Sequence, residues 1–504
     1  MSTAIIYFCK LPIVGYNKTR LQGFLPVEDI QYLSVYLLKK NYQAIADTAV
    51  SHFVFVSPKE KAQQIRDFLP VKQEQVFGQI DHPHLGIRMG EAIRSVFEQG
   101  YDKVLLLGCD LIDITSDLLQ EIIEKLDYED VVIAPTLDGG YGVIASRTYC
   151  PQLFDLVSYS HDQVCQDTVS QAKQAGLSYA LTRTIHDIDT REDVIRHLSG
   201  DPEAVYFNQG EYNANFLIDQ GKKLLRIALA SQMHLDRQIE YEYLALKGLA
   251  PSGVVPQVYE YVTETDLLGK GYLVEEYLPG RPLDYQTDLT IAAELLAAVH
   301  AVNPTEIPSL IVANQPFEVM YQEFLDMYSR YQSWEEKDRE VEAKIDSLLA
   351  GLDRYQRDLP LENSCVINTE LNSHNFLINP GHQSYIIDWE KPLVGEREQD
   401  LAHFLAPTTT LWKTQHLLSK DKILDFVKTY NQSSSQKVNL AKLKQYLHFT
   451  CLRGITWCAM AYVQYLEAEK VQANGKAFET ISRFISIDFL EMIESYIDSL
   501  EDLF

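Results

Sequence analysis

The sequence predicts an α/β domain followed by a small β-rich lobe and a helical lobe. Through residues 1–200, short apolar runs alternate with amphipathic segments, which is the pattern of βαβ units and a mostly parallel sheet. The alternation stops at a turn-rich junction, Ser199 to Pro202. From about Leu289 onward the segments are long and helical. These three observations indicate more than one folding unit, as does the length of 504 residues.

The predicted elements follow in chain order. Buried strands are expected at "AIIYFC", "HFVFVS", "KVLLLG" and "DVVIAP", and helices between them at "EDIQYLSVYLLKKNYQAIAD", "GIRMGEAIRSVFEQG" and "SDLLQEIIEKL". After the junction, "AVYFNQGEYNANFLID" and "GKKLLRIAL" are expected to form two strands around a turn, followed by the helix "HLDRQIEYEYLALKGL" and strands near "PQVYEYVTE" and "GYLVEEYL". We therefore place domains at 1–200 and 203–504, the second with a small lobe (203–281) and a helical lobe (282–504).

Composition restricts the classes of function. Lys and Arg total 44 against 71 Asp and Glu, a net charge of −27, which repels nucleic-acid backbones and anionic membrane surfaces but does not exclude nucleotides. No apolar stretch approaches the roughly 20 residues that span a bilayer. The seven cysteines are scattered, form no CxxC pair and are odd in number, which favours reduced thiols in a cytoplasmic protein.

A basic loop leaves the first predicted strand. In "KLPIVGYNKTRL", Lys10, Lys18 and Arg20 follow the strand's carboxyl end, where open α/β sheets bind ligands. Three cations there, in a strongly acidic chain, suggest a cradle for a polyphosphate. We assign Lys10 to nucleotide binding, and Lys18 and Arg20 to catalysis. An ordinary solvated loop is the alternative.

Carboxylates and glycines follow other predicted strands. Asp110 ends "LLLGCD", and Asp187 and Asp189 alternate in "HDIDTRED", so these three are candidate ligands of Mg²⁺ or Mn²⁺. Gly139 and Gly140 in "LDGGYG" would let the backbone approach a ligand closely. The alternative for Asp187 to Asp193 is a helix N-cap cluster, in which Thr190 or Asp189 caps the helix "REDVIRHL".

These motifs together resemble a known family. "FCKLPIVGYNKTRL", "HLGIRMGEA", "GCDLID", "APTLDGGYGVIA" and "DIDTREDV", in this order, are similar to the glycosyltransferase-A-type family that includes glycosyltransferases assigned to arsenosugar biosynthesis. They are more distantly similar to 2-phospholactate guanylyltransferases. The resemblance implies a Rossmann-like fold of nucleotide-diphospho-sugar transferases, with the metal at the "GCD" aspartate. One departure is that Leu111 and Ile112 replace the Cys-Pro usual after that aspartate.

The small lobe offers candidate nucleotide contacts. The turn "FNQGEYNANF" contains only Gly210, a weak glycine-rich loop. Arg226, in "LLRIA", stands on an inner strand where a kinase presents its phosphate-binding cation. Its expected partner on the next helix is Glu242, or alternatively Glu240; a surface glutamate is the competing interpretation. We also assign Glu276, which ends "YLVEE", to nucleotide binding.

The stretch "VINTELNSHNFLINPGHQSYIIDWEKP" has the spacing of a phosphotransferase catalytic segment. Glu370 stands five residues before Asn375, the offset between catalytic acid and metal-binding Asn in kinase loops. Asn375 and Asp388 bracket a predicted hairpin that turns at Pro380–Gly381. Such a hairpin would bring an amide oxygen and a carboxylate to one nucleotide-bound Mg²⁺. Incidental polar ends on a hairpin are the alternative.

This half resembles the aminoglycoside phosphotransferase and choline kinase family. The resemblance covers roughly residues 204–415, through "NQGEYNANF", "LLRIA", "YLVEEYLPG", "LLAAVHAV", "NTELNSHNFLI", "IIDWE" and "GEREQDLAHF". It implies a two-lobed, protein-kinase-like fold. The family's His-Gly-Asp is Asn-Thr-Glu here. Glutamate keeps the carboxylate but adds a methylene, and a displacement of about 1 Å can cost about 100-fold in rate.

Read together, the halves suggest consecutive steps. We expect an ATP-dependent kinase of a small-molecule alcohol, fused to a metal-dependent nucleotidyltransferase that activates the phosphorylated product with a second NTP. One alternative is a glycosyltransferase with a nucleotide-sugar donor and a sugar acceptor, fused to the kinase. In another, the kinase-like lobe binds nucleotide without turnover.

Overall fold

A seven-stranded sheet lies at the centre of the N-terminal region. The computed structural model describes residues 2–210, 212–231, 233–467 and 475–502. The strands are β1 (Thr3–Lys10), β2 (Ser51–Ser57), β3 (Val76–Gly78), β4 (Lys103–Leu107), β5 (Val131–Pro135), β6 (Tyr141–Ser146) and β7 (Tyr179–Leu181). Their order is β3-β2-β1-β4-β6-β5-β7. Neighbouring strands are parallel except for β6, which runs antiparallel to β4 and β5. The sheet is mostly parallel, as predicted.

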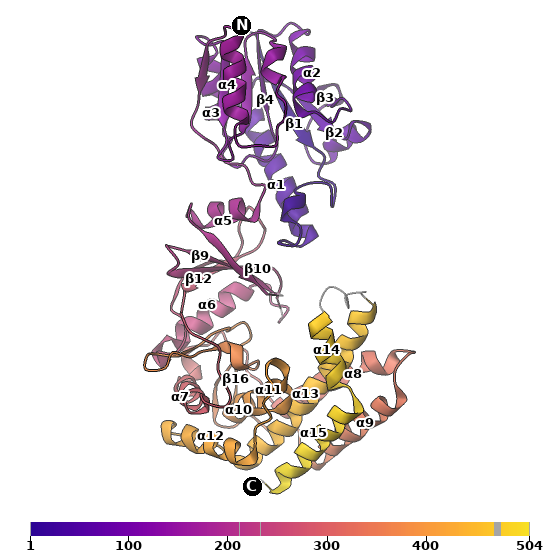
Figure 1. Cartoon of the computed structure of the whole chain (residues 1–504), viewed down its shortest axis with the longest axis vertical. Coiled ribbons are helices and arrows are strands. Elements are labelled where there is room, and N and C mark those ends of the chain that lie inside the picture. The colour runs from indigo at the N-terminus through magenta and orange to yellow at the C-terminus, as the bar shows by residue number, and fades with distance from the viewer. Residues whose placement is uncertain (1, 211, 232, 468–474, 503–504) are drawn as a thin grey trace. The chain divides into compact units, whose positions relative to one another are not determined.

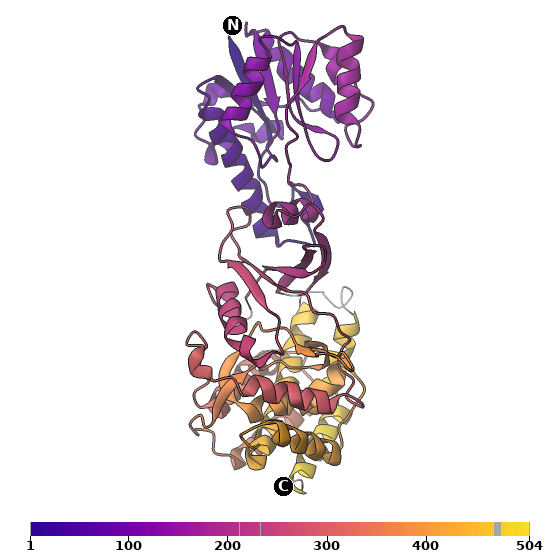
Figure 2. The ribbon, with the colours of Figure 1, turned by 90° about the vertical axis from the view of Figure 1, so that its left-hand side faces the viewer.

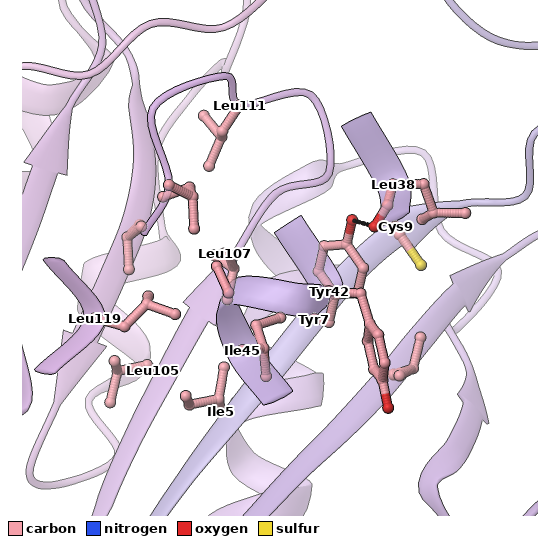
Figure 3. Packing of buried hydrophobic residues seen from close by; sticks show 14 of the residues in the cluster. Ile5, Tyr7, Cys9, Leu38, Tyr42, Ile45, Leu105, Leu107, Leu111 and Leu119 are labelled. Atoms are coloured by element: carbon pink, nitrogen blue, oxygen red, sulfur yellow. Dashed lines mark hydrogen bonds between the residues drawn. The ribbon is translucent and has the colours of Figure 1, made fainter. Parts of the chain in front are cut away.

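Helices cover both faces of this sheet (Figure 1). They are α1 (Val27–Ala46), α2 (Leu85–Phe97), α3 (Ser116–Lys125) and α4 (Val164–Gln174), whereas α5 (Arg191–Ser199) lies beside β9 (Asn213–Ile218) of the following sheet. Alternate residues of β1 enter two different cores, because side chains alternate across a strand. Ile5, Tyr7 and Cys9 pack with apolar residues of α1 and α3, whereas Ala4 and Ile6 pack with those of α2 and α4. Figure 3 shows the first core, where the Tyr7 hydroxyl donates to the Leu38 carbonyl (2.9 Å).

The strand order creates a switch point between β1 and β4. From β1 the chain proceeds through β2 to β3 on one side and then returns to place β4 on the other. Crossover connections diverge at such a point, which leaves a crevice outside the carboxyl ends of the strands. The basic loop follows β1 and Asp110 follows β4, so both predicted groups stand at this crevice.

A five-stranded sheet follows, in the order β11-β12-β10-β9-β8. Its strands are β8 (Val205–Gln209), β9 (Asn213–Ile218), β10 (Lys223–Ala228), β11 (Val258–Val262) and β12 (Tyr272–Glu276), and α6 spans Gln238–Leu249. The single strand expected from "AVYFNQGEYNANFLID" is two strands, separated by the turn that was also expected at "FNQGEYNANF". That segment is itself a hairpin, β8 with β9, closed by the hydrogen bond from Gly210 N to Asn213 O (2.9 Å).

The chain divides into two compact units. The first comprises Met1–Gln220, Leu225–Leu229 and Thr263–Tyr272, and the second comprises Gly221–Leu224, Ala230–Val262 and Leu273–Phe504.

Inside the first unit, two contacts hold the later segments to α1 and the loop before it. Lys270 Nζ lies 2.5 Å from Asp29 Oδ2, and the rings of Phe24 and Phe216 pack edge to face at 5.7 Å. The predicted boundary between residues 200 and 203 concerns independent folding and stays a prediction.

Helices dominate the second unit, and both ribbon views show them gathered together from α7 onward (Figures 1 and 2). They are α7 (Leu289–His300), α8 (Pro316–Ser333), α9 (Arg339–Ala350), α10 (Arg397–Leu405), α11 (Pro407–Lys413), α12 (Lys420–Ser433), α13 (Leu440–Glu467), α14 (Gly475–Phe484) and α15 (Ile487–Ser499). The antiparallel pairs β13 (Ser364–Ile367) with β16 (Leu393–Glu396) and β14 (Phe376–Leu377) with β15 (Tyr385–Ile386) interrupt them. Among the described helices, none has the length and apolar character to cross a membrane.

Candidate active sites

One cavity contains nearly all the predicted site residues of the first 200. It has a volume of about 670 Å³, and its lining includes these six predicted residues: Lys10, Lys18, Arg20, Asp110, Asp187 and Asp189. The structure therefore brings together cations and carboxylates that are up to 179 positions apart in the sequence (189 − 10). Gly140 also lines the cavity.

The basic loop has a defined conformation. Asn17 is buried and its Nδ2 donates to the Leu11 carbonyl (2.8 Å), which ties the end of the loop back to its beginning. Lys18 adopts the left-handed region (φ 48°), an uncommon conformation for a residue with a side chain. Its ammonium donates to the Ile188 carbonyl and lies 3.4 Å from Asp189 Oδ1, and the side chain is only 8% exposed. Lys10 and Arg20 are exposed.

Backbone pairing places the three aspartates together. Leu111 and Asp187 form an isolated antiparallel bridge, and Ile188 N donates to the Asp110 carbonyl (3.0 Å). Burial raises the pKa of Asp110, and the negative charge of Asp189 adds to this while Lys18 opposes it. Burial, followed by the charges of Asp138 and Asp110, raises the pKa of Asp187 to about 7. Crowded carboxylates of this kind fit a divalent cation, which would relieve their repulsion.

Protein ligands alone do not complete a metal site here. Within the described ranges, no three His, Cys, Asp or Glu side chains converge closely enough to hold a metal ion. Mg²⁺ is usually held by one or two carboxylates together with substrate phosphates and water. Asp110 and Asp187 fit this arrangement. Thr190 is the N-cap of α5, with Asp193 completing a capping box, so Asp193 has a structural role.

The two glycines serve different purposes. Gly139 has φ 86°, and a Cβ there would lie 1.9 Å from the Asp162 carbonyl oxygen, so its close approach is to the chain itself. Gly140 N donates to Asp138 Oδ1 (3.0 Å), which also accepts from Thr136 Oγ1 (2.5 Å). The turn is thus fixed by packing and by Asp138, and only Gly140 of the pair lines the cavity.

In the second unit, the predicted catalytic segment forms the expected hairpin. Asn375 Nδ2 donates to Asp388 Oδ2 (3.1 Å), so the two predicted metal ligands converge. Glu370 N donates to Asn368 Oδ1 (3.2 Å), and the Glu370 carboxylate lies 3.6 Å from Lys391 Nζ and 3.8 Å from Arg453 Nη2. Glu370 is therefore flanked by two cations that sequence reasoning did not identify.

A buried aspartate organises this segment. Asp400, in α10, is fully buried and accepts hydrogen bonds from Asn368 N and Thr369 N (both 2.8 Å). His300 lies beside it, with Nε2 at 3.3 Å, and its Nδ1 contacts the Tyr430 hydroxyl (2.9 Å). Charge-assisted hydrogen bonds to backbone amides are among the strong ones. Asp400 thus fixes the backbone directly before Glu370. Asp400 lies within "GEREQDLAHF", and no local sequence pattern indicated this role.

Backbone strain marks both ends of the site. Thr369 has φ 73° and Asp388 has φ 68°. Positive φ is a genuine outlier for a β-branched residue such as threonine. Thr369 stands where the resembled family has glycine, and three hydrogen bonds hold it: its N to Asp400, its Oγ1 to Lys391 O (3.1 Å) and its carbonyl from Arg453 Nη1 (3.4 Å).

Helix α6 packs beside the segment that follows Asp388. Gln238 Nε2 donates to Glu242 Oε1 (2.8 Å) and to the Glu390 carbonyl (2.7 Å), and the Tyr241 hydroxyl donates to the Pro392 carbonyl. Glu242 is 1% exposed, whereas Glu240 pairs at the surface with Arg237 (3.2 Å). As the predicted partner of buried Arg226, the buried Glu242 is therefore favoured over Glu240, and the pairing itself stays a prediction.

The remaining predicted nucleotide contacts belong to the five-stranded sheet. Arg226 is buried on β10. Glu276 ends β12, where its Oε2 accepts from Gln257 N (3.5 Å). A Cβ on Gly210 would meet nothing closer than 3.9 Å, so this turn does not require glycine for space.

Two separate parts of the chain match known protein families. Residues 40–161 match a family described as an uncharacterized protein conserved in bacteria (DUF2064), and residues 203–420 match the phosphotransferase enzyme family. The chain is thus a fusion of a DUF2064 region and a phosphotransferase-family region. No curated protein sequence matches it.

Solved structures similar to each part exist. A protein from Desulfovibrio desulfuricans G20 assigned as a nucleotide-diphospho-sugar transferase is 28% identical, with a TM-score of 0.37, covering 39% of this chain and 87% of its own. A protein from Ralstonia eutropha JMP134 assigned as an aminoglycoside phosphotransferase is 15% identical (TM-score 0.43, 57% and 92%). A spectinomycin phosphotransferase, solved with ADP and spectinomycin, is 14% identical (TM-score 0.43, 58% and 93%).

Proposed function

We propose that the chain is a bifunctional transferase: a small-molecule kinase followed by a nucleotidyltransferase that acts on the kinase's product. The observation that carries the proposal is the convergence of Asn375 with Asp388, at 3.1 Å, in a segment whose backbone is fixed before Glu370. The match of residues 203–420 to the phosphotransferase enzyme family supports it.

In the kinase step, Glu370 accepts the proton of the acceptor hydroxyl as its oxygen bonds to the γ-phosphorus of ATP. The bond from that phosphorus to the bridging oxygen breaks, and ADP leaves. Asn375 and Asp388 would hold Mg²⁺, which supplies neutralising charge for the phosphates when bound. Lys391 and Arg453 flank Glu370 and hold its longer side chain in place. Positioning dominates phosphoryl transfer, so these contacts suit a non-standard base.

In the second step, the new phosphomonoester attacks the α-phosphorus of an NTP, and pyrophosphate leaves. Lys10, Lys18 and Arg20 line the cavity as cations that stabilise the departing pyrophosphate. Asp110 and Asp187 would hold the divalent metal, which supplies charge for the α-phosphate when bound. The raised pKa values of these two carboxyls support a cation between them.

Product analysis on the intact chain tests the proposal. With ATP, a second NTP and a panel of small alcohols, we expect ADP from the kinase step and pyrophosphate from the second. Nucleoside diphosphate release from a nucleotide-sugar, without pyrophosphate, would identify the N-terminal half as a glycosyltransferase instead. ATP binding without acceptor-dependent ADP formation across the panel would identify the kinase-like lobe as a binding module.

A further inference from the structure

We propose that Arg88 is an anion-binding residue of the N-terminal cavity, that buried Gln79 positions it, and that its ligand is a phosphate group. Neither residue was among the predicted site residues, although both line the cavity. The inference deepens the proposed nucleotidyl transfer and rests on it for the identity of the ligand.

Gln79 is fixed by three hydrogen bonds to strands. It follows β3 and is 4% exposed, and its backbone N donates to the Val56 carbonyl (2.9 Å). Its side-chain Nε2 donates to the carbonyls of Cys9 (2.9 Å) and Phe55 (3.0 Å), which belong to β1 and β2. Both hydrogens of the amide are therefore used, and the orientation of the amide is determined. Its Oε1 accepts from Arg88 Nη1 (2.9 Å).

Arg88 stands on the first turn of α2, and glycines fix how this helix lies. A Cβ on Gly86 would come within 2.2 Å of the Phe154 carbonyl oxygen, and one on Gly90 would touch the Phe154 ring at 3.4 Å. The face carrying these glycines packs tightly on Pro151–Phe154, a short 3₁₀ helix. The direction of the Arg88 side chain is therefore set by both the helix and Gln79.

The charge of Arg88 lacks compensation from the protein. In the described part of the chain, no carboxylate lies within 4.0 Å of its guanidinium, and its buried Nε has no hydrogen-bond partner. By contrast, Lys18 in the same cavity has Asp189. A half-buried cation whose hydrogen-bond partner is a neutral amide is costly to keep, and burial lowers its pKa. An anion in the cavity would supply the missing charge and accept from Nε.

The competing explanation, called here the staple explanation, is that the hydrogen bond between Arg88 and Gln79 only stabilises the fold. It predicts that replacing Arg88 changes stability and leaves anion affinity unchanged. The phosphate group itself has two sources under the proposed function: the polyphosphate of the NTP, or the phosphomonoester that attacks it. Pyrophosphate imitates the first and inorganic phosphate the second.

The test is calorimetric titration of the full chain with pyrophosphate, and separately with inorganic phosphate, in the presence of Mg²⁺. An Asp388→Ala background removes metal-dependent binding at the kinase site. We expect Arg88→Gln to weaken binding of at least one probe by about tenfold or more, since a charged hydrogen-bonding group is lost. The affinity of Arg88→Lys for that probe should lie between those of the parent and of Arg88→Gln. Arg94→Gln is the matched control, because Arg94 is on the same helix but pairs at the surface with Glu91 (2.5 Å) and Glu98 (2.6 Å).

The outcomes separate the explanations. Loss of pyrophosphate binding assigns Arg88 to the nucleotide, and loss of phosphate binding assigns it to the acceptor. If Arg88→Gln binds both probes as tightly as Arg94→Gln, the staple explanation holds and the proposal fails, while the proposed nucleotidyl transfer stands. If the parent chain binds neither probe nor an NTP, the proposed function of this half fails together with the role of Arg88.

Discussion

The two candidate sites are held in place by different forces. In the N-terminal cavity, burial and neighbouring carboxylates raise the pKa values of Asp110 and Asp187, and Lys18 forms an ion pair with Asp189. In the kinase-like lobe, one buried carboxylate, Asp400, fixes the backbone through two amides. Charge therefore governs the first site and backbone geometry governs the second. Substitutions and pH should act on them differently.

The largest expected effects come from the two aspartates proposed as metal ligands, Asp388 and Asp110. Asp388→Ala should abolish ATP-dependent phosphorylation without unfolding the chain, because it removes the carboxylate that meets Asn375. Asp110→Ala should abolish only pyrophosphate release from the N-terminal half. ADP and pyrophosphate are measured in parallel, with supplied acceptors for each half. If Asp110→Ala also stopped ATP turnover on a supplied kinase acceptor, the two sites would be coupled and the comparison would fail.

A smaller loss of kinase activity is expected on replacing Glu370, the proposed base. Glu370→Gln should lower kcat by orders of magnitude, whereas Glu370→Asp should retain part of it, with a loss of about 100-fold from the displaced carboxylate. The aspartate would also retreat from Lys391 and Arg453, which flank the glutamate. Steady-state kinetics on the best acceptor measures both, with the exposed Glu306→Gln as control. Wild-type turnover by Glu370→Gln would show that this residue is not the base.

The sequence pointed to residues that the structure brings together, but not to the residues that fix their positions. Strand-end loops and fixed offsets gave Lys18, Asp110 and Asn375, because these positions follow from chain-local patterns. Arg453 was not predicted because α13 contacts the catalytic segment from 84 positions away (453 − 369), and no local sequence pattern encodes that contact. Asp400 escaped for the same reason. The hairpin β8–β9 was predicted only in part, because a turn was expected around Gly210 but the whole segment "AVYFNQGEYNANFLID" was counted as a single strand.

The pH dependence of stability should distinguish the charge-governed site. Asp187 has a folded pKa of about 7, above its ordinary value of 3.8. The folded state therefore binds more protons than the unfolded state between these values, and Asp187 removes stability as pH rises from about 4 to about 7. Without divalent metal, Asp187→Asn should gain in melting temperature over the parent at pH 8 and much less at pH 5.

Two measurements check this interpretation. Adding Mg²⁺ should reduce the difference in melting temperature between Asp187→Asn and the parent at pH 8, because the cation offsets the repulsion of Asp187 by Asp110 and Asp138. Asp193→Asn is the contrasting variant, since Asp193 caps α5 through Thr190. An Asp187→Asn advantage that is the same at pH 5 and pH 8 would contradict the raised pKa.

The smallest expected effect tests the geometry-governed site at Thr369. Replacing it by glycine removes a side chain from φ 73°, which relieves about 1–2 kcal/mol. Against this stand the lost hydrogen bond to the Lys391 carbonyl, about 0.5–1.5 kcal/mol, and the backbone freedom of glycine, about 0.5–1 kcal/mol. The free energy of unfolding should therefore barely change, and kinase activity should persist. Thr369→Ala loses the same hydrogen bond but keeps a Cβ at positive φ, so it should be less stable than Thr369→Gly by about 1 kcal/mol.

At Thr369 the glycine variant is expected to be more stable than the alanine variant, whereas in helix interiors alanine is the more stable of the two. At Thr456, buried in the interior of α13, glycine should be less stable than alanine by about 1 kcal/mol, as in helix interiors generally. Urea unfolding of the four variants compares the two positions within one chain. If alanine exceeded glycine at both positions, Thr369 would not be strained, and the hydrogen bonds from Asp400 and Arg453 would not be holding an unfavourable backbone in place for catalysis.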